Sequence, residues 1–416
     1  MNVGQRDLDI VIYGATGFVG GLVAESLAKA GQGLRVGLAG RSAQRLSAVR
    51  HRLGAAAEQW PVIEADLSDQ SALENMVSRS QVVISAIGPY SRYGLPLVAA
   101  CAATGTDYVD LAGEVPFVHN SIERHHLQAV ETGARIVHSC GFDSIPSDLS
   151  VYALHRRAER DGAGQLGATT LVLRTYSGGC SGGSLQTMVE MMRLAASDPR
   201  LRAILDDPYN LSPDRTEEPD LGAQPDVDAR SGSEIAPELT GLWMGGYLMA
   251  LYNTRCVRRT NALLKWPYGK QLRYTETLSY GSSLAAPMLA TLSGLTITAA
   301  SRLGGAYLQR VPAELLDRMM PASGTGYDQG ARGYYKTETY TRTTSGKRYV
   351  ATMSQRGDPG YSATATLLVA SALIMARGRE RMSDLRGVLT PVAAMGDALL
   401  AELPLAGVSI STERLG

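Results

Sequence analysis

Residues 9–20 read DIVIYGATGFVG, and this stretch decides the fold of the first part of the chain. Residues 8–13 form a short run of apolar and β-branched side chains, which is typical of a buried parallel strand. A helical pattern at 20–30 follows the glycines and stops at Gly31. The glycine-rich stretch is therefore expected to be the turn between a strand and a helix.

Each glycine of this turn has its own steric task. Gly14 allows a sharp exit from the strand, Gly17 lets the backbone approach a pyrophosphate, and Gly20 lets the helix pack on the sheet. The start of the helix then offers backbone N–H groups and the positive end of its dipole to phosphates. The spacing is GxxGxxG rather than GxGxxG, but its setting predicts a dinucleotide site rather than a purely structural turn. The expected contacts here are Gly14, Ala15, Thr16, Gly17, Phe18 and Val19.

The ends of the following strands complete this predicted site. The second strand ends in LAGRS (38–42), where an NAD site would place an acid for the ribose hydroxyl. Arg41 suits a 2′-phosphate because its guanidinium forms a charge-assisted fork, and Ser42 adds a hydroxyl donor. This favours NADPH, the alternative being an arginine that only ends the strand. The remaining expected contacts are Asp66 on the adenine side and Ala86, Ile87 and Gly88 near the nicotinamide.

The alternation of elements predicts the fold class. Apolar strand candidates recur, with helical stretches between them, at 34–39, 61–65, 81–87, 107–111 and 135–139. Such alternation is typical of βαβ units, which predicts an α/β, Rossmann-type doubly wound parallel sheet. After about residue 146, strands with one polar face predict a second, α+β domain on a largely antiparallel sheet. We divide the chain into 1–145, 146–385 and 386–416, and expect the last segment to pack back on the first domain.

Composition excludes several classes of protein. The 416 residues carry 40 basic and 40 acidic side chains, so a nucleic-acid partner is not expected. The four cysteines form no CxxC pair, and the adjacent His125 and His126 lack ligand spacing, so no disulfide framework or metal is expected. The start of the chain has no signal-like pattern, which indicates a cytoplasmic protein. The sequence predicts no particular oligomeric state.

Three stretches have unusual charge. Residues 277–301 contain no charged side chain, which predicts a buried or interfacial helix, with peripheral membrane contact as the alternative. Residues 206–234 carry nine acidic residues, whereas 255–273 carry six cations and no acid. The last two stretches either neutralise each other or are separately solvated; the alternative is a docking face for an acidic partner.

The glycine turn, LAGRS, residues 86–114 and CGFDSIPSDL (140–149) together resemble the saccharopine dehydrogenase-like oxidoreductases. Residues 223–274 and GVLTPVAAMGDALL (387–400) are similar to the enoyl reductase subfamily, which acts in trans beside mycobacterial polyketide synthases. The resemblance implies NADPH-dependent reduction of the C=C bond of an enoyl thioester in phthiocerol and phenolphthiocerol lipid synthesis. It also implies an acyl-thioester lipid or polyketide substrate and an acyl carrier domain as partner. A reductase of an imine or ketone, and a non-catalytic NADPH-binding scaffold, remain alternatives.

Enoyl reduction needs a hydride at the β-carbon, a proton at the α-carbon and a donor at the thioester oxygen. The groups that supply these should follow the carboxyl ends of the parallel strands. Tyr90 and Tyr93 are candidate donors, with loop packing as the alternative, and Tyr90 is preferred. Asp143 is a candidate buried functional carboxylate. Asp110 and Glu114 either orient the substrate or cap helices.

Overall fold

The first of two sheets is built on the strand that the sequence predicts at 8–13. The computed structural model describes residues 6–178, 189, 198–226, 229–299 and 333–416. All strand pairs of this sheet are parallel, in the order β13-β6-β5-β4-β1-β2-β3. The strands are β1 (Leu8–Tyr13), β2 (Val36–Gly40), β3 (Val62–Glu64), β4 (Ser80–Ser85), β5 (Asp107–Val109), β6 (Arg135–Val137) and β13 (Gly387–Leu389).

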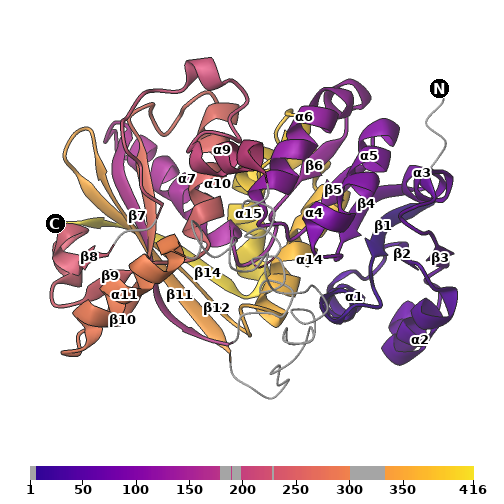
Figure 1. Cartoon of the computed structure of the whole chain (residues 1–416). Coiled ribbons are helices and arrows are strands. Elements are labelled where there is room, and N and C mark those ends of the chain that lie inside the picture. Colours follow the sequence, from indigo (N-terminus) through magenta and orange to yellow (C-terminus); the bar gives the residue numbers. More distant parts are fainter. Residues whose placement is uncertain (1–5, 179–188, 190–197, 227–228, 300–332) are drawn as a thin grey trace.

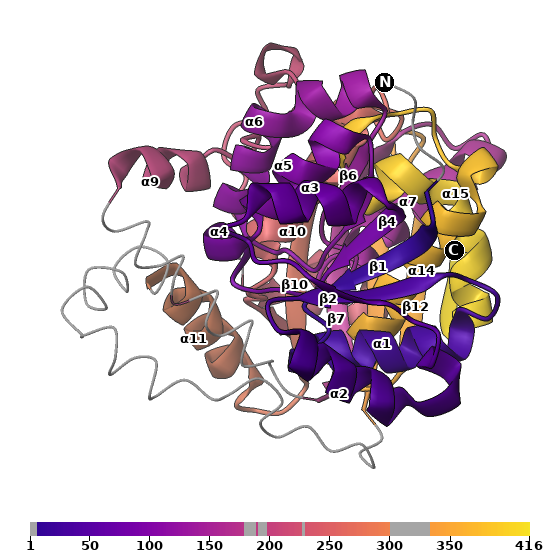
Figure 2. The same cartoon turned by 90° about the vertical axis from the view of Figure 1, so that its right-hand side faces the viewer.

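Helices cover both faces of the parallel sheet, as a doubly wound fold requires (Figure 2). Ile10 and Ile12 of β1 point into a core that also contains α1, α2, α14 and α15, whereas Val11 points into the core of α3, α5 and α6. A short helix, α4, follows β4. The bounds are α1 (Phe18–Ala30), α2 (Ala43–Leu53), α3 (Gln70–Ser78), α4 (Tyr90–Tyr93), α5 (Leu95–Thr104), α6 (Val115–Thr132), α14 (Ser362–Arg377) and α15 (Pro391–Glu402).

The second sheet is antiparallel apart from one pair. Its order is β14-β12-β11-β7-β10-β9-β8, and only β7 and β10 run parallel. Gly346 makes the tight turn between β11 and β12 with a φ of 81°. The strands are β7 (Leu166–Ser177), β8 (Arg230–Ser231), β9 (Trp243–Gly245), β10 (Arg273–Gly281), β11 (Tyr334–Thr343), β12 (Arg348–Arg356) and β14 (Val408–Leu415).

Two helices lie between the sheets and fix how they meet (Figure 1). These are α7 (Ile145–Arg160) and α10 (Ala250–Leu263). Leu154 of α7 and Val257 of α10 are buried in one core with Leu171 and Tyr349 of the second sheet. Two further helices, α9 (Pro199–Asp206) and α11 (Ala286–Ala299), lie outside this arrangement. The carboxyl ends of the parallel strands therefore open toward elements of the second half of the chain.

The segment 386–416 does not lie on one domain. Its first strand, β13, pairs with β6 in the parallel sheet, and α15 packs on α7 and α14. Its last strand, β14, instead pairs with β12 at the edge of the second sheet. The sequence predicts that this segment packs on the first domain, and β14 does not. Its polar residues alternate with less exposed ones, a pattern that suits a half-exposed strand at the edge of the second sheet. The domain division at 145 and 385 stays a prediction.

Candidate functional site

The glycine turn has the geometry of a phosphate cradle. Gly14 has a φ of +88°, and a Cβ on it would lie 2.6 Å from Cγ2 of Ile87. A Cβ on Gly20 would lie 2.1 Å from the carbonyl oxygen of Gly14. A Cβ on Gly17 would meet only that carbonyl, at 3.3 Å, so Gly17 has an open side. Two glycines thus make the turn, and the third leaves room for a ligand to approach the backbone.

The start of α1 supplies the hydrogen-bond donors of this cradle. The helix begins at Phe18, and no side chain caps it at Gly17. Thr16 and Gly17 are exposed, while Ala15 is buried beneath them. An uncapped helix start with exposed residues beside it is a site for phosphate. The fold of this segment therefore fits the dinucleotide that the sequence predicts.

Arg41 stands exposed at the end of β2, on the same side of the sheet as the turn. Within the described residues, its guanidinium makes no hydrogen bond or ion pair, so it can bind an incoming anion. Ser42 is the N-cap of α2 and accepts a hydrogen bond from the backbone N–H of Arg45 at 3.3 Å. Asp66 follows β3, and hydrogen bonds from Ser68 lower the pKa of its carboxyl.

The loop after β4 lies directly against the glycine turn. The N–H of Ala86 donates to the carbonyl of Tyr13 at 3.0 Å, and Ile87 touches Gly14. Gly88 is exposed at the end of this loop. The three residues expected near the nicotinamide are thus held beside those expected at the phosphates.

Tyr90 is held inside the protein. Its hydroxyl donates to the carbonyl of Ser85 at 2.9 Å and accepts from the N–H of Leu111 at 3.2 Å. Burial raises the pKa of this hydroxyl well above its usual value. These contacts connect the loops after β4 and β5, which is a structural role. Tyr93, on the last residue of the same short helix, is 41% exposed.

Glu114 and Asp110 fix the loops around Tyr90. Glu114 accepts hydrogen bonds from the backbone N–H groups of Tyr90 and Ser91, both at 2.7 Å. It therefore caps α4 rather than the helix that follows it. Asp110 accepts from the N–H of Ser139 at 2.9 Å and pairs with Nδ1 of His138 at 2.7 Å. Of the two roles considered for these carboxylates, Glu114 therefore has that of a helix cap. Asp110 instead connects the ends of β5 and β6.

Asp143 lies in the loop that leaves β6 and enters α7. The preceding Phe142 packs on Tyr335 of the second sheet, with ring centroids 4.5 Å apart. Burial raises the pKa of the Asp143 carboxyl to about 6, and within the described residues no hydrogen bond to this carboxylate opposes the shift. A carboxyl that titrates near neutrality can donate and accept a proton. Asp143, which is partly exposed in this loop, is therefore a candidate acid–base group.

The basic stretch 255–273 divides into buried arginines on α10 and three exposed cations, Lys265, Lys270 and Arg273. Arg255, Arg258 and Arg259 of α10 are all at least 95% buried. Arg259 donates to the carbonyls of Leu211 and Val388, and Arg258 donates to that of Pro208 at 3.1 Å. The two stretches also form the ion pairs Arg255–Asp226 and Lys270–Glu217, which fits the expectation that they neutralise each other. The buried arginines are not available for the alternative, an acidic docking partner.

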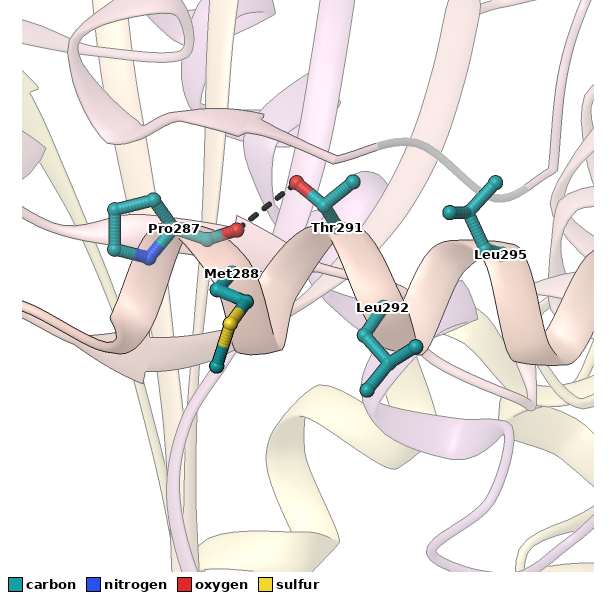
Figure 3. A pocket seen from close by; sticks show the side chains of 5 residues that line it. All are labelled: Pro287, Met288, Thr291, Leu292 and Leu295. Carbon is teal, nitrogen blue, oxygen red and sulfur yellow. Dashed lines mark hydrogen bonds between the residues drawn. The ribbon is translucent and has the colours of Figure 1, made fainter.

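The uncharged stretch 277–301 divides into the end of β10 and α11, with residues 300 and 301 outside the described residues. Only Ala286, Ala290 and Gly294 of α11 are buried. Five residues of α11, all apolar except Thr291, line a pocket on this helix (Figure 3), namely Pro287, Met288, Thr291, Leu292 and Leu295. The helix is therefore exposed on one side rather than buried. No helix among the described residues is long and apolar enough to cross a bilayer.

Three buried polar residues of this region escape sequence reasoning. Asn253 on α10, Glu276 on β10 and Asp148 on α7 are each almost completely buried. Burial raises the pKa of Glu276 and of Asp148 to about 7. In the sequence Glu276 stands between Thr275 and Thr277 in a strand pattern, which gives no signal that it is buried. Within the described part of the chain, no group of three or more His, Cys, Asp or Glu side chains is placed to hold a metal ion.

Comparison with known proteins identifies the family. Residues 10–137 match the saccharopine dehydrogenase NADP binding domain. The chain is 55% identical to a Mycobacterium tuberculosis (H37Rv) protein with the provisional name trans-acting enoyl reductase Rv2449c. It is 54% identical to the trans-acting enoyl reductase of Mycobacterium bovis (BCG), and both alignments cover 100% of both chains.

A solved structure shows the same fold. Apo saccharopine dehydrogenase (L-Glu forming) from Saccharomyces cerevisiae matches with a TM-score of 0.55 and 16% identity, over 98% of this chain and 100% of that chain. The matched NADP binding domain contains the glycine cradle described above. The protein is thus an oxidoreductase that uses NADPH, and the chain belongs to the saccharopine dehydrogenase-like family, in its group of trans-acting enoyl reductases.

Proposed function

We propose that this protein reduces the C=C bond of an enoyl thioester in trans, with a polyketide or lipid intermediate as substrate. The observation that carries the proposal is 54–55% identity, over the full length, to proteins named for that activity. The position of Asp143, a partly exposed acid in the loop after β6 at the carboxyl edge of the parallel sheet, supports it, because enoyl reduction needs a proton source beside the cofactor.

The cofactor would lie across the carboxyl ends of β1, β2 and β4. Gly17 and the start of α1 would hold the pyrophosphate, and Arg41 the 2′-phosphate. When bound, NADPH supplies the hydride that goes to the β-carbon of the substrate. The further residues that we assign to this site are Gly14, Ala15, Thr16, Phe18, Val19, Ser42, Asp66, Ala86, Ile87 and Gly88.

Asp143 is the proposed proton donor. The hydride adds to the β-carbon, the C=C electron pair moves toward the thioester, and the Asp143 carboxyl gives its proton to the α-carbon. The carboxylate then regains a proton from solvent. Tyr93, which is exposed on the loop after β4, is the proposed donor to the thioester oxygen. Tyr90 would act by holding the loop that carries Tyr93, because its own hydroxyl is bonded to Ser85.

The apolar face of α11 is the proposed contact for the acyl chain. It carries three leucines and a methionine that are each at least 42% exposed: Met288, Leu289, Leu292 and Leu295. Such a face suits a long aliphatic chain, whose burial is favourable by about 0.8 kcal/mol per methylene. The acyl carrier domain that would deliver the substrate would bind a surface other than α10, because the arginines of that helix are buried.

The activity is tested with NADPH and α,β-unsaturated acyl thioesters, both carrier-linked and as small analogues. We expect NADPH oxidation together with a saturated product, detected by mass spectrometry. Cofactor deuterated on the nicotinamide should leave its label on the β-carbon. Oxidation with imines or ketones but not with thioesters would assign the alternative reductase activity. Binding of NADPH with no turnover of any substrate would favour a non-catalytic scaffold.

A further inference from the structure

A buried asparagine connects Asp143 to the second half of the protein. Asn253 of α10 has no exposed surface. Its side-chain Nδ2 donates to the backbone carbonyl of Asp143 at 2.6 Å and to Oε2 of Glu276 at 3.0 Å. Its Oδ1 accepts a hydrogen bond from the hydroxyl of Ser144 at 2.8 Å. One side chain thus holds two consecutive residues of the loop between β6 and α7.

Glu276 fixes the orientation of this amide. Oε1 of Glu276 accepts from the hydroxyl of Tyr274 at 2.7 Å, and the Ser147 side chain also hydrogen-bonds to the carboxylate. The amide nitrogen of Asn253 faces both Glu276 and the Asp143 carbonyl, because the opposite orientation would set the amide oxygen against a carbonyl that can only accept. The amide is therefore held from β10 on one side and from the start of α7 on the other.

The Asp143 loop depends on this support. Ser144 is the N-cap residue of α7, but its side chain makes no capping hydrogen bond and donates to Asn253 instead. Within the described residues, the Asp143 side chain has no hydrogen bond of its own. The backbone of this loop sets where the Asp143 side chain starts and so which rotamers are open to its carboxyl, and Asn253 holds the carbonyl of that same residue.

We propose that Asn253 is a positioning residue that aims the Asp143 carboxyl at the reacting carbon, with Glu276 holding Asn253 in place. This inference rests on the proposed function, in which Asp143 is the proton donor. Asn253 itself does not touch the substrate. Its effect on the reaction must therefore pass through Asp143, and this distinguishes positioning from a general effect on stability.

A double-mutant cycle between Asn253→Ala and Asp143→Asn tests the proposal. Asp143→Asn alone should lower kcat for an enoyl thioester by roughly 100-fold or more, the range for loss of a general acid. Asn253→Ala alone should lower kcat by roughly 10-fold, because small misplacements of reacting groups are costly. The Kd of Asn253→Ala for NADPH should stay within about twofold, since Asn253 bonds to Asp143, Ser144 and Glu276 and to none of the residues assigned to the cofactor. In the Asp143→Asn background, Asn253→Ala should change kcat by less than about twofold.

Asn261→Ala is the matched control. Asn261 lies on the same helix, is also buried, and makes two hydrogen bonds, to Gly269 and Tyr268, far from Asp143 along the helix. This variant should lower the melting temperature as Asn253→Ala does, but it should leave kcat unchanged. Ser144→Ala, which removes one hydrogen bond to Asn253, should lower kcat less than Asn253→Ala and provides a milder variant should the latter fold poorly.

The outcomes separate the two claims. If Asp143→Asn lowers kcat but Asn253→Ala and Ser144→Ala do not, positioning is overturned and the proton donor stands. Positioning is also overturned if Asn253→Ala lowers kcat equally in the wild type and in the Asp143→Asn variant. If Asp143→Asn keeps full activity, the assignment of the proton donor fails, and the positioning role fails with it.

Discussion

Nη1 of Arg255 lies 2.7 Å from Oδ2 of Asp226, and this ion pair joins the basic and acidic stretches of the chain. The two side chains are only 4% and 15% exposed. The same guanidinium donates to the carbonyl of Leu205 at the end of α9. These contacts hold the loop after α9 on α10, so Arg255 and Asp226 are not available to a partner.

Removal of one partner of this pair should destabilise the protein. Asp226→Ala leaves the buried Arg255 without its counter-charge, and we expect a loss of about 3 kcal/mol in the free energy of unfolding, measured in urea. Lys270→Ala, in the exposed pair with Glu217, is the control and should cost less than about 1 kcal/mol. Equal losses in the two variants would show that burial does not increase the contribution of the Arg255–Asp226 pair to stability.

Arg41→Ala should weaken NADPH binding without affecting NADH. Arg41 is the exposed cation at the end of β2, and its loss should raise the Kd for NADPH by roughly 10- to 100-fold, because a charge-assisted hydrogen bond is worth about 1.5–3 kcal/mol. Fluorescence titration with both cofactors measures this. Arg124→Ala, an exposed arginine on α6, serves as the control. A proportionate loss for NADH would place Arg41 outside the 2′-phosphate site.

The glycines of the turn should respond differently to alanine. Gly20→Ala forces a methyl into the Gly14 carbonyl and should destabilise the protein by about 3 kcal/mol or more. Gly17→Ala has only one close neighbour, so the protein should fold with a cost of about 1 kcal/mol. NADPH affinity should nevertheless fall, because the added methyl would lie where the pyrophosphate approaches. Thermal melts with and without NADPH separate the two effects, and normal NADPH affinity in Gly17→Ala would contradict this placement.

The turnover rate should depend on the ionisation of Asp143. Burial raises the pKa of its carboxyl to about 6, so the proton-bearing form is lost as the pH rises above that value, and kcat should fall. Asp143→Asn should abolish this part of the profile along with most of the activity. Asp148→Asn is the control and should leave the pH profile unchanged. The pKa of Asp148 is also raised, to about 7, but its carboxylate is bonded to Val392 and Thr260 inside the protein. A pH profile that is unchanged in Asp143→Asn would exclude Asp143 as the donor.

A charge on the apolar face of α11 should discriminate between acyl chains. Leu292→Glu should raise the KM for a long-chain enoyl thioester by roughly 10-fold, the value of one buried leucine, and leave a short-chain analogue unaffected. Leu127→Glu, at a 76% exposed position on α6, is the matched control. Unchanged KM values together with reduced binding to phospholipid vesicles would assign the face to a membrane surface instead.

Local patterns predict the first sheet well because its strands are buried on both faces, apart from the edge strand β3. The apolar run at 8–13 becomes β1, and the glycine turn occupies the expected place before α1. Apolar patterns do not predict the buried helix α10, because its sequence NTRCVRRTNAL is polar and basic. Its arginines are buried against backbone carbonyls of a distant loop, so no apolar stripe marks the helix. The role of Tyr90 was equally hidden, since its partners Ser85 and Leu111 come from two different loops.

The pairing of β13 with β6 has a consequence for how the chain acquires its structure during synthesis. Residues near the end of the chain complete one edge of the parallel sheet, and α14 from the same half covers one of its faces. A ribosome therefore releases the glycine turn long before the strand and the helix that finish its sheet. Contacts so distant in sequence form late. The complete sheet beneath the glycine turn can therefore form only after residues 387–389 have been synthesised.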